Sequence, residues 1–240
     1  GNPNADWIQD FTPAIISEAV ADLLFEEKGI KAEELRKDLQ IYKVPIRFTL
    51  EAEIHFKVKS KFFPEATGYN IVGYVEGSDP DLRKECLIIG GHFDHLGQHC
   101  GLLFPGANDN ASGSAVVMEI AEAFSRLKTA PKRSVVFVLF GGEEMGLQGS
   151  SFFADNLPPQ FKKMDGMFNF DMTGAGDGVG CGVSSEPKEL VSILQDADKK
   201  IKILRRTRFF GRVGVRGSDY ASFFVKGVPC ISFASNGPHL

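Results

Sequence analysis

Two histidines and an aspartate follow an apolar run that ends in two glycines. The run "CLIIG" (86–90) and the second glycine, Gly91, are followed by "HFDH" (92–95). Imidazole nitrogens and carboxylate oxygens are ligands that zinc takes in proteins. A strand that simply ends in a polar turn would contain the same residues, so this stretch alone leaves both interpretations open.

Other acidic residues and histidines stand near the ends of apolar, strand-like runs elsewhere in the chain. The residues at or just past such an end, or in one case in a loop between a strand and a helix, are His92, Asp94, Asp109, Glu143, Glu144, Asp171 and His239. In α/β sheets the carboxyl ends of parallel strands meet at one edge, and ligand sites gather there. We therefore expect these side chains to converge.

The adjacent pair Glu143 and Glu144 favours the metal interpretation. The pair follows "VVFVLFGG" (135–142), the most hydrophobic stretch of the chain. Two neighbouring carboxylates at the mouth of a buried strand repel each other and are partly desolvated, which is unfavourable unless a cation is present. Three or four carboxylates with one or two histidines fit a divalent ion such as zinc. Two ions about 3.5–4 Å apart would account for the number of carboxylates.

The elements that must position these residues alternate between strand and helix. The hydrophobic patterns predict strands over 67–80, 85–91, 133–142, 166–172 and 228–234, and helices within 106–128, 147–156, 186–200 and 218–227. Ser112 or Ser114 is expected to cap the first of these helices. The alternation indicates an α/β fold with a mixed, mostly parallel central β-sheet and helices on both faces.

Before this alternation begins, the patterns predict two helices and one strand. Residues 14–26 and 32–40 have the helical spacing of apolar residues, and 47–60 alternate as in a long half-exposed strand. His55 lies on the polar face of that strand and is expected at the surface. We expect a single domain over 1–240, with 1–45 as a helical lead-in.

Bulk composition excludes several functional classes. The chain has 240 residues, of which 43% are hydrophobic and 24% charged, and its net charge is −4. Because it has no basic stripe, no nucleic-acid partner is expected, and "KILRRTR" (202–208) is interpreted as a solvated face or strand edge.

No apolar run approaches the roughly 18 residues that span a bilayer. The polar start shows no signal peptide, and the four scattered cysteines form no disulfide framework.

Four motifs in this order resemble a known family. "GGHFDHLG", "GANDNASG", "GGEEMGLQGS" and "NFDMTG" are similar to the motifs of the co-catalytic zinc aminopeptidases of the M28 peptidase family. The resemblance covers roughly residues 65–240 and implies the zinc-exopeptidase type of α/β fold. The segment before it is similar to the stretch that comes after a protease-associated domain in longer family members.

The resemblance also implies a set of metal ligands. His92 and Asp171 would bind one zinc ion, Asp109 would bridge two ions, and Glu144 would bind the second. The family's fifth ligand is a histidine a few residues beyond a "GPH"-like stretch. Because His239 matches the histidine of that stretch, the true ligand is expected beyond Leu240, in a natural chain longer than this sequence; otherwise His239 substitutes for it. Two zinc ions are expected if the fifth ligand is present.

Catalytic roles are implied by the same resemblance. Glu143 would be the general base that takes a proton from a zinc-bridging water, and Asp94 would hydrogen-bond His92 and fix its tautomer. The implied substrate is a peptide with a free N-terminus, and the implied reaction is hydrolysis of its N-terminal peptide bond. Relatives of this type are often exported, which implies a periplasmic or extracellular location. The oligomeric state is left open.

Two alternative functions remain on the same scaffold. A glutaminyl cyclase would use one zinc ion and a similar glutamate for acyl transfer. A non-catalytic binding domain would have kept the fold and lost the metals, although the retained carboxylates argue against it.

Three residues near the motifs have open roles. His95 either lines the substrate cleft or only decorates its loop, whereas His99 is not expected to bind metal. Asp219 either caps the helix that begins beside it or lies in the outer shell of the metal site.

Overall fold

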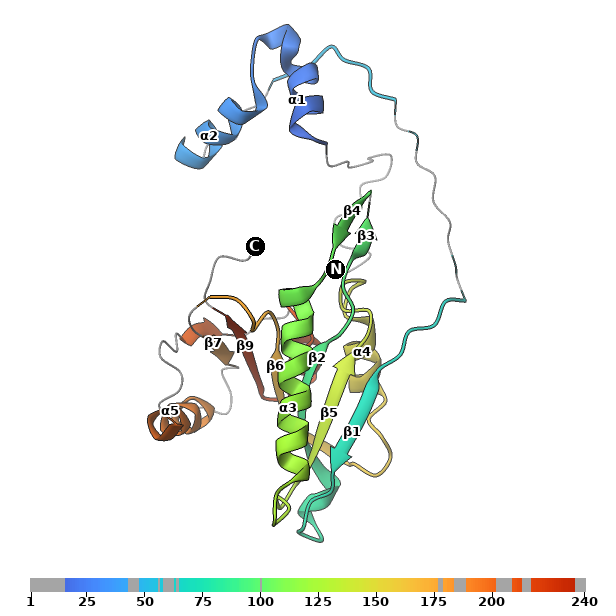
Figure 1. Ribbon diagram of the computed structural model, residues 1–240, viewed down its shortest axis with the longest axis vertical. Coiled ribbons are helices and arrows are strands. Elements are labelled where there is room, and N and C mark those ends of the chain that lie inside the picture. Colours follow the sequence, from blue (N-terminus) through green and yellow to red (C-terminus); the bar gives the residue numbers. More distant parts are fainter. Residues whose placement is uncertain are drawn as a thin grey trace. The chain divides into compact units, whose positions relative to one another are not determined.

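The computed structural model describes ten segments of the chain. They are residues 16–42, 48–55, 57, 63, 65–99, 101–176, 179–183, 189–201, 209–212 and 217–235. The chain separates into two compact units, one formed by Thr67–Leu240 with Gly1–Asn2 and the other by Pro3–Ala66 (Figure 1). That residues 1–240 act as one catalytic domain stays a prediction.

The smaller unit contains the two predicted helices. These are α1 (Glu18–Phe25), followed by a short 3₁₀ turn, and α2 (Ala32–Tyr42). The predicted strand over 47–60 is wrong for the described residues 48–55 and 57, which form no strand. An alternating pattern becomes a strand only where a second strand supplies hydrogen bonds, and the described part of this unit contains none. His55 is exposed as predicted, with its Nε2 3.3 Å from Glu53 Oε1.

The larger unit is built on a seven-stranded sheet with the order β1-β5-β2-β6-β9-β7-β8. Its strands are β1 (Ile71–Val75), β2 (Glu85–His92), β5 (Ser134–Phe140), β6 (Lys163–Phe170), β7 (Val179–Val183), β8 (Phe209–Arg212) and β9 (Cys230–Ser235). The central strands β5, β2, β6 and β9 are parallel, whereas β1 and β7 run antiparallel to their neighbours β5 and β9. The predicted mixed, mostly parallel sheet is confirmed.

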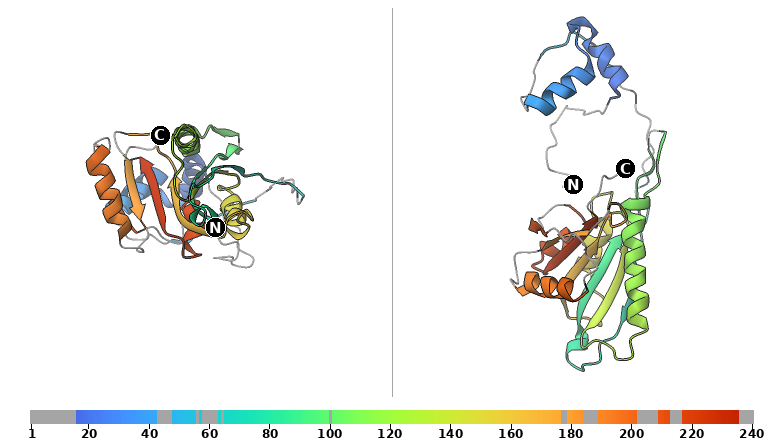
Figure 2. Two further views of the ribbon diagram at one scale, coloured as in Figure 1. Left: turned by 90° about the horizontal axis from the view of Figure 1, so that it is seen from below. Right: turned by 60° about the vertical axis from the view of Figure 1, so that its left-hand side comes forward.

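Helices cover both faces of this sheet (Figures 1 and 2). On one face α3 (Gly113–Ser125) packs over the central strands, and α5 (Glu189–Ile201) packs farther along through Leu190 and Leu194. On the other face lie α4 (Gln148–Asp155) and α6 (Tyr220–Phe224). A separate hairpin of β3 (Gly97–His99) and β4 (Leu102–Phe104) stands between β2 and α3 in the sequence.

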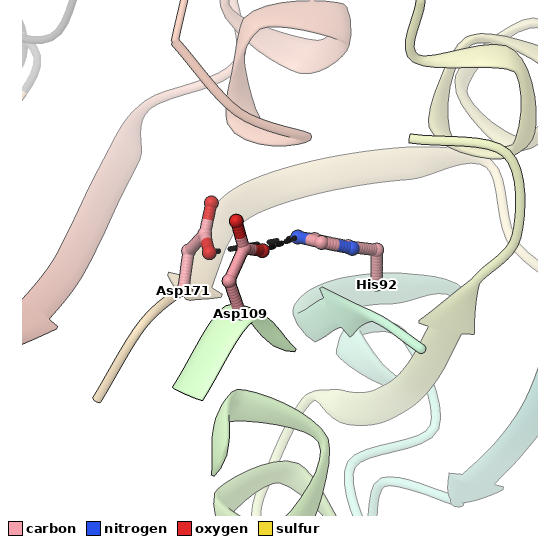
Figure 3. A group of neighbouring side chains, drawn as sticks. All are labelled: His92, Asp109 and Asp171. Atoms are coloured by element: carbon pink, nitrogen blue, oxygen red, sulfur yellow. Dashed lines mark ion pairs between the residues drawn. The ribbon is translucent and has the colours of Figure 1, made fainter. Parts of the chain in front are cut away.

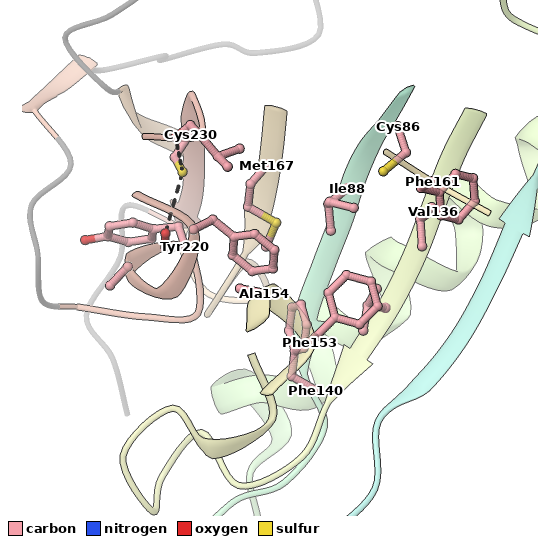
Figure 4. Close-up of a cluster of buried hydrophobic side chains, with 14 residues drawn as sticks. Cys86, Ile88, Val136, Phe140, Phe153, Ala154, Phe161, Met167, Tyr220 and Cys230 are labelled. Carbon is pink, nitrogen blue, oxygen red and sulfur yellow. Dashed lines mark hydrogen bonds between the residues drawn. The ribbon is translucent and has the colours of Figure 1, made fainter. Parts of the chain in front are cut away.

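The central strands are buried on both faces, which explains their unbroken apolar sequences. Ile88 and Val136 face the α4–α6 side, whereas Ile89 and Val135 face α3. On the α4–α6 side the rings of Phe140 and Phe153 meet edge to face with centroids 6.1 Å apart (Figure 4). Cys86 and Cys230 are buried within this core.

The start of α3 differs from the prediction that a serine caps it. The Gly113 amide donates to Asn110 Oδ1 at 3.0 Å instead. The two serine hydroxyls are used elsewhere: Ser112 donates to the Asn108 carbonyl, and Ser114 donates to the His92 carbonyl. The Ser114 bond attaches the beginning of α3 to the end of β2.

Among the described residues, no helix combines the length and the apolar character needed to cross a membrane.

Candidate metal centre

His92 is the last residue of β2, and its side chain is only 1% exposed. Its Nδ1 lies 3.0 Å from the Asp94 backbone carbonyl, which can only accept, so Nδ1 carries a hydrogen. The other ring nitrogen, Nε2, is thereby turned towards two carboxylates. A histidine that binds a metal through one ring nitrogen commonly donates a hydrogen bond from the other to a backbone carbonyl, as His92 does here.

Asp109 and Asp171 converge on this nitrogen (Figure 3). Asp109 Oδ1 lies 3.3 Å and Asp171 Oδ1 3.5 Å from His92 Nε2. The three donor atoms all lie within 4.8 Å of one another. The Asp171 Oδ1 atom is buried and has no hydrogen-bond partner among the described residues. A buried carboxylate oxygen without a hydrogen bond is costly unless a cation or proton compensates it, so this donor set fits a zinc ion.

The carboxylates around His92 favour a positive charge at its imidazole ring. Burial lowers the pKa of His92, but the Asp171 carboxylate and the charges of Asp219 and Glu143 outweigh it and raise that pKa to about 10. Burial also raises the pKa of Asp109, and the carboxylates of Asp171 and Glu144 raise it further. In the metal-free protein an imidazolium therefore supplies the charge that a bound cation would supply.

A second group of possible donors also contains Asp109. His95 Nδ1 is 2.6 Å from Glu144 Oε1 and 3.9 Å from Asp109 Oδ1. The three donor atoms again lie within 4.8 Å of one another. Asp109 thus belongs to both groups, the position that the sequence resemblance implies for a bridging ligand.

Glu143 follows the end of β5 and is partly buried beside both groups. Burial raises its pKa to about 7; the negative charges of Asp171, Glu144 and Asp109 add to this effect, and His92 opposes it. A carboxylate with a pKa near neutrality can both accept and release a proton at physiological pH.

Asp94 differs in detail from its expected role. Its Oδ1 lies 3.7 Å from His92 Nδ1, beyond hydrogen-bond distance, and the hydrogen bond to His92 comes from the Asp94 backbone. The Asp94 carboxylate instead accepts the amides of Glu143 and Glu144, at 3.1 Å and 3.3 Å. Asp94 therefore fixes the tautomer of His92 through its carbonyl and the turn of the two glutamates through its side chain.

Asn110 is a residue of the site that sequence reasoning missed. Its buried side chain donates to the Phe170 carbonyl at 3.0 Å and accepts the amides of Gly113 and Met172. These bonds join the loop that carries Asp109 to the end of β6, where Asp171 comes next. Its position next to Asp109 in a polar loop is the one signal that the sequence offered.

Asp219 does not cap α6, contrary to one of its two expected roles. Its side chain is fully buried, and neither carboxylate oxygen has a hydrogen-bond partner among the described residues. Burial raises the pKa of Asp219 to about 7, although the nearby Ser150 hydroxyl and the His92 charge favour its ionised form. Asp219 thus precedes α6 without capping it through its side chain, and its carboxylate lies within the electrostatic field of the site.

A cavity of about 590 Å³ opens beside the second donor group. His95 and Asp109 contribute to its wall, together with apolar side chains that include Phe104, Pro105 and Met172. His95 thus does line a cleft. His239 lies outside the described residues, and its role stays a prediction.

Known proteins are similar to this chain over most of the larger unit. The model of peptidase family M28 matches residues 70–239. The aminopeptidase of Pseudomonas aeruginosa is 32% identical over 170 residues, which are 67% of this chain and 30% of that protein. Leupeptin-inactivating enzyme 1 of Streptomyces exfoliatus is 41% identical over 111 residues, 46% of this chain and 24% of that protein. The chain therefore spans less than a third of the length of these two relatives.

Solved structures have the same architecture. A zinc aminopeptidase from Bacillus subtilis superposes with a TM-score of 0.61 at 24% identity, covering 74% of this chain and 42% of that one. A glutaminyl cyclase from an Acidobacteriales bacterium superposes with a TM-score of 0.58 at 20% identity, covering 71% and 60% of the two chains. At these identities the two likenesses establish the fold alone.

Proposed function

Because the chain belongs to peptidase family M28, as its four motifs predicted, we propose that it forms the catalytic part of a zinc-dependent aminopeptidase. The observation that carries this proposal is the pair of donor groups that share Asp109, with the Glu143 carboxylate beside them. Homologous proteins called aminopeptidases support the class of reaction. The proposed substrate is a peptide with a free N-terminus.

In this proposal the protein side chains divide into ligands and a base. His92, Asp109 and Asp171 would hold one zinc ion, and Asp109 and Glu144 would contribute ligands to a second. Zinc would supply Lewis acidity there, for a water whose pKa falls towards about 7 and for the carbonyl of the substrate. Glu143 accepts the proton of the attacking water and delivers it to the leaving amine. Asp94 keeps both glutamates oriented through their amides.

Replacing Glu143 by Gln tests the proposal. The variant keeps the shape of the side chain but cannot take a proton, so kcat for leucine p-nitroanilide should fall by about 10²–10⁴-fold. Zinc content, measured by elemental analysis, should stay unchanged because Glu143 is not a ligand.

Glu119→Gln on the exposed side of α3 is the matched control and should keep full activity. Retained activity in Glu143→Gln would show that another group is the base. Activity only towards an N-terminal glutaminyl substrate, with release of ammonia, would replace the aminopeptidase by a glutaminyl cyclase.

A further inference from the structure

We propose that Phe104, at the end of the β3–β4 hairpin, is a specificity-determining residue: it makes the cavity beside Asp109 select substrates whose first residue has a large apolar side chain. The inference rests on the proposed aminopeptidase function and deepens it by naming the class of substrate. Three features carry it: the position of the cavity, the composition of its wall, and the way the hairpin is held against the loops of the candidate metal centre.

The cavity adjoins the candidate metal centre. Asp109 forms part of its wall and belongs to both groups of possible metal donors. A peptide whose N-terminal bond lies at that centre therefore has its first side chain beside the cavity. Because the peptide ends at this residue, the side chain can fill a pocket, whereas the rest of the peptide must leave the site. The cavity of about 590 Å³ is within the range of small-molecule pockets and admits an aromatic side chain.

The wall of the cavity is largely apolar. Two of its polar side chains are already bonded within the protein: Asn108 Oδ1 accepts the Gly174 amide at 2.9 Å, and His95 Nδ1 lies 2.6 Å from Glu144 Oε1, the distance of a hydrogen bond. An apolar side chain that enters the cavity is removed from water, which is favourable in proportion to the area buried. The apolar side chains of the wall are Phe104, Pro105, Ala107, Met172 and Ala175.

The register of the hairpin leaves the Phe104 ring available to this wall. Its partner across the hairpin is Gly97, which has no side chain, so no cross-strand side chain covers the ring. The ring instead meets the His95 ring at 64°, with centroids 6.5 Å apart. Successive side chains of a strand point to opposite faces, so the neighbouring Leu103 points away from the face of Phe104 and is 74% exposed.

The side chain against which Phe104 packs is itself held in place. Gly106 has a φ of 71°, and a Cβ atom there would come within 2.8 Å of His95 Cβ and 2.9 Å of the Asp109 carbonyl. Only a glycine lets the chain between Phe104 and Asp109 close this tightly over His95. The hydrogen bond to Glu144 fixes the imidazole from the loop after β5. Phe104 therefore belongs to a wall that is formed before substrate binds, which lowers the cost of binding.

A purely structural role is the competing explanation for Phe104. Its ring would then only cover His95 and stabilise the hairpin. Loss of such a role would lower activity towards all substrates by the same factor. Loss of a specificity role changes the ratio of activities towards large and small side chains.

That ratio is measured as kcat/KM of the zinc-loaded protein for phenylalanine p-nitroanilide over alanine p-nitroanilide. The wild type should favour the phenylalanyl substrate by at least about 10-fold, since a single methylene in an apolar pocket is already worth about 10–200-fold. Phe104→Ala should lower the ratio by about 10-fold, because the large side chain loses an apolar contact that alanine does not reach. Phe104→Leu should keep most of the preference. Circular dichroism checks that each variant folds.

Two further variants complete the comparison. Leu103→Ala removes an apolar side chain from the opposite face of the same strand, so it is the matched control and should keep the wild-type ratio. Ala175→Leu adds bulk to another part of the wall and should lower kcat/KM for the phenylalanyl substrate more than for the alanyl substrate. This variant tests the cavity even if Phe104→Ala does not fold.

Binding without hydrolysis is measured in the zinc-loaded Glu143→Gln variant. Phenylalaninamide and alaninamide are titrated by calorimetry, and the first should bind at least about 10-fold more tightly. Adding Phe104→Ala should remove this difference.

A wild type without preference, or a ratio that Phe104→Ala leaves unchanged, would overturn the inference. Hydrolysis of both p-nitroanilides with such a ratio refutes the role of Phe104 and leaves the peptidase reaction intact. The opposite failure is equally recognisable. A protein that hydrolyses no aminoacyl substrate, but whose tighter binding of phenylalaninamide depends on Phe104, would keep the pocket and refute the peptidase reaction.

Discussion

At the scale of single residues, the site is defined by carboxylates that lack ordinary partners. Asp171 Oδ1 and both oxygens of Asp219 are buried without a hydrogen bond among the described residues. Asp171 Oδ1 faces His92, and a bound cation explains why it lacks a hydrogen bond. Asp219 is more deeply buried, and its raised pKa means that the metal-free folded protein holds a proton on this carboxyl group near neutral pH.

Asp219 therefore predicts a specific pH dependence. Its folded pKa is about 7, above the roughly 3.9 of an unfolded aspartate. Between these values the folded state binds a proton that the unfolded state has released. The contribution of protonated Asp219 to stability is therefore fully present below pH 4 and is lost as the pH rises towards 7. Asp219→Asn has no carboxyl group to ionise at this position, so the variant does not lose stability in this way. In chelator-treated protein, the free energy of unfolding of the variant relative to wild type should rise by up to about 1.4 kcal/mol per pH unit from pH 4 to 7.

Urea denaturation at several pH values measures this difference. Asp81→Asn, at an exposed position, is the control and should track the wild type. Parallel pH profiles for wild type and Asp219→Asn would contradict the assignment of a proton to Asp219.

At the scale of elements, the metal centre depends on how α3 is attached to the sheet. The loop of residues 107–112 reaches the end of β6 through Asn110, and the Ser112 hydroxyl accepts the Thr173 amide. Gly113 makes this approach possible, because a Cβ atom there would lie 2.2 Å from the Phe170 carbonyl. Asp109 and Asp171 are thereby held on one nitrogen of His92.

Asn110→Ala should loosen this attachment. The variant loses three buried hydrogen bonds, each worth about 1 kcal/mol, so the free energy of unfolding should fall by about 3 kcal/mol. Zinc affinity should fall as well, because Asp109 is no longer fixed relative to Asp171. Urea denaturation and zinc titration measure the two effects.

Asn156→Ala is the matched control, since Asn156 is exposed and its side-chain amide donates to the nearby Phe152 carbonyl of α4. It should change the free energy of unfolding by less than about 1 kcal/mol. An Asn110 variant as stable as this control, with unchanged zinc affinity, would show that the loop is held by other contacts.

At the scale of the whole molecule, all described candidate site residues lie in the unit of Thr67–Leu240. The family match over 70–239 covers nearly the same residues. The site is therefore assembled from one sheet and its loops, and the described part of Pro3–Ala66 supplies none of the donors.

The central sheet and the metal donors could be predicted because both produce strong local signals. Buried parallel strands such as β2 and β5 are continuously apolar, and polar residues at their carboxyl ends must meet at one edge. The hairpin of β3 and β4 was missed because strands of three residues carry no readable periodicity. The strand predicted over 47–60 was wrong because alternating apolar and polar residues indicate only which side chains would share a face. They do not supply the partner strand that a β-strand needs for its hydrogen bonds.

The remaining parts of the site depend on contacts between distant segments. Asn110 acts on Phe170 and Met172, about 60 residues away in sequence. Likewise, the contact of His95 with Glu144 spans 49 residues. No pattern in the sequence predicts such pairs. The Asn110 bonds form where η3 (Ala107–Ser112) meets the residues at the end of β6, and the His95–Glu144 contact forms where the loops after β2 and β5 meet.

Anomalous diffraction at the zinc absorption edge would show whether Asp109 lies between two zinc ions. Crystals of zinc-loaded protein should show two peaks about 3.5–4 Å apart, one on each side of the Asp109 carboxylate. One peak should lie between His92 and Asp171, and the other next to Glu144. An absence of zinc at Asp109, with full occupancy elsewhere on the protein, would contradict the account.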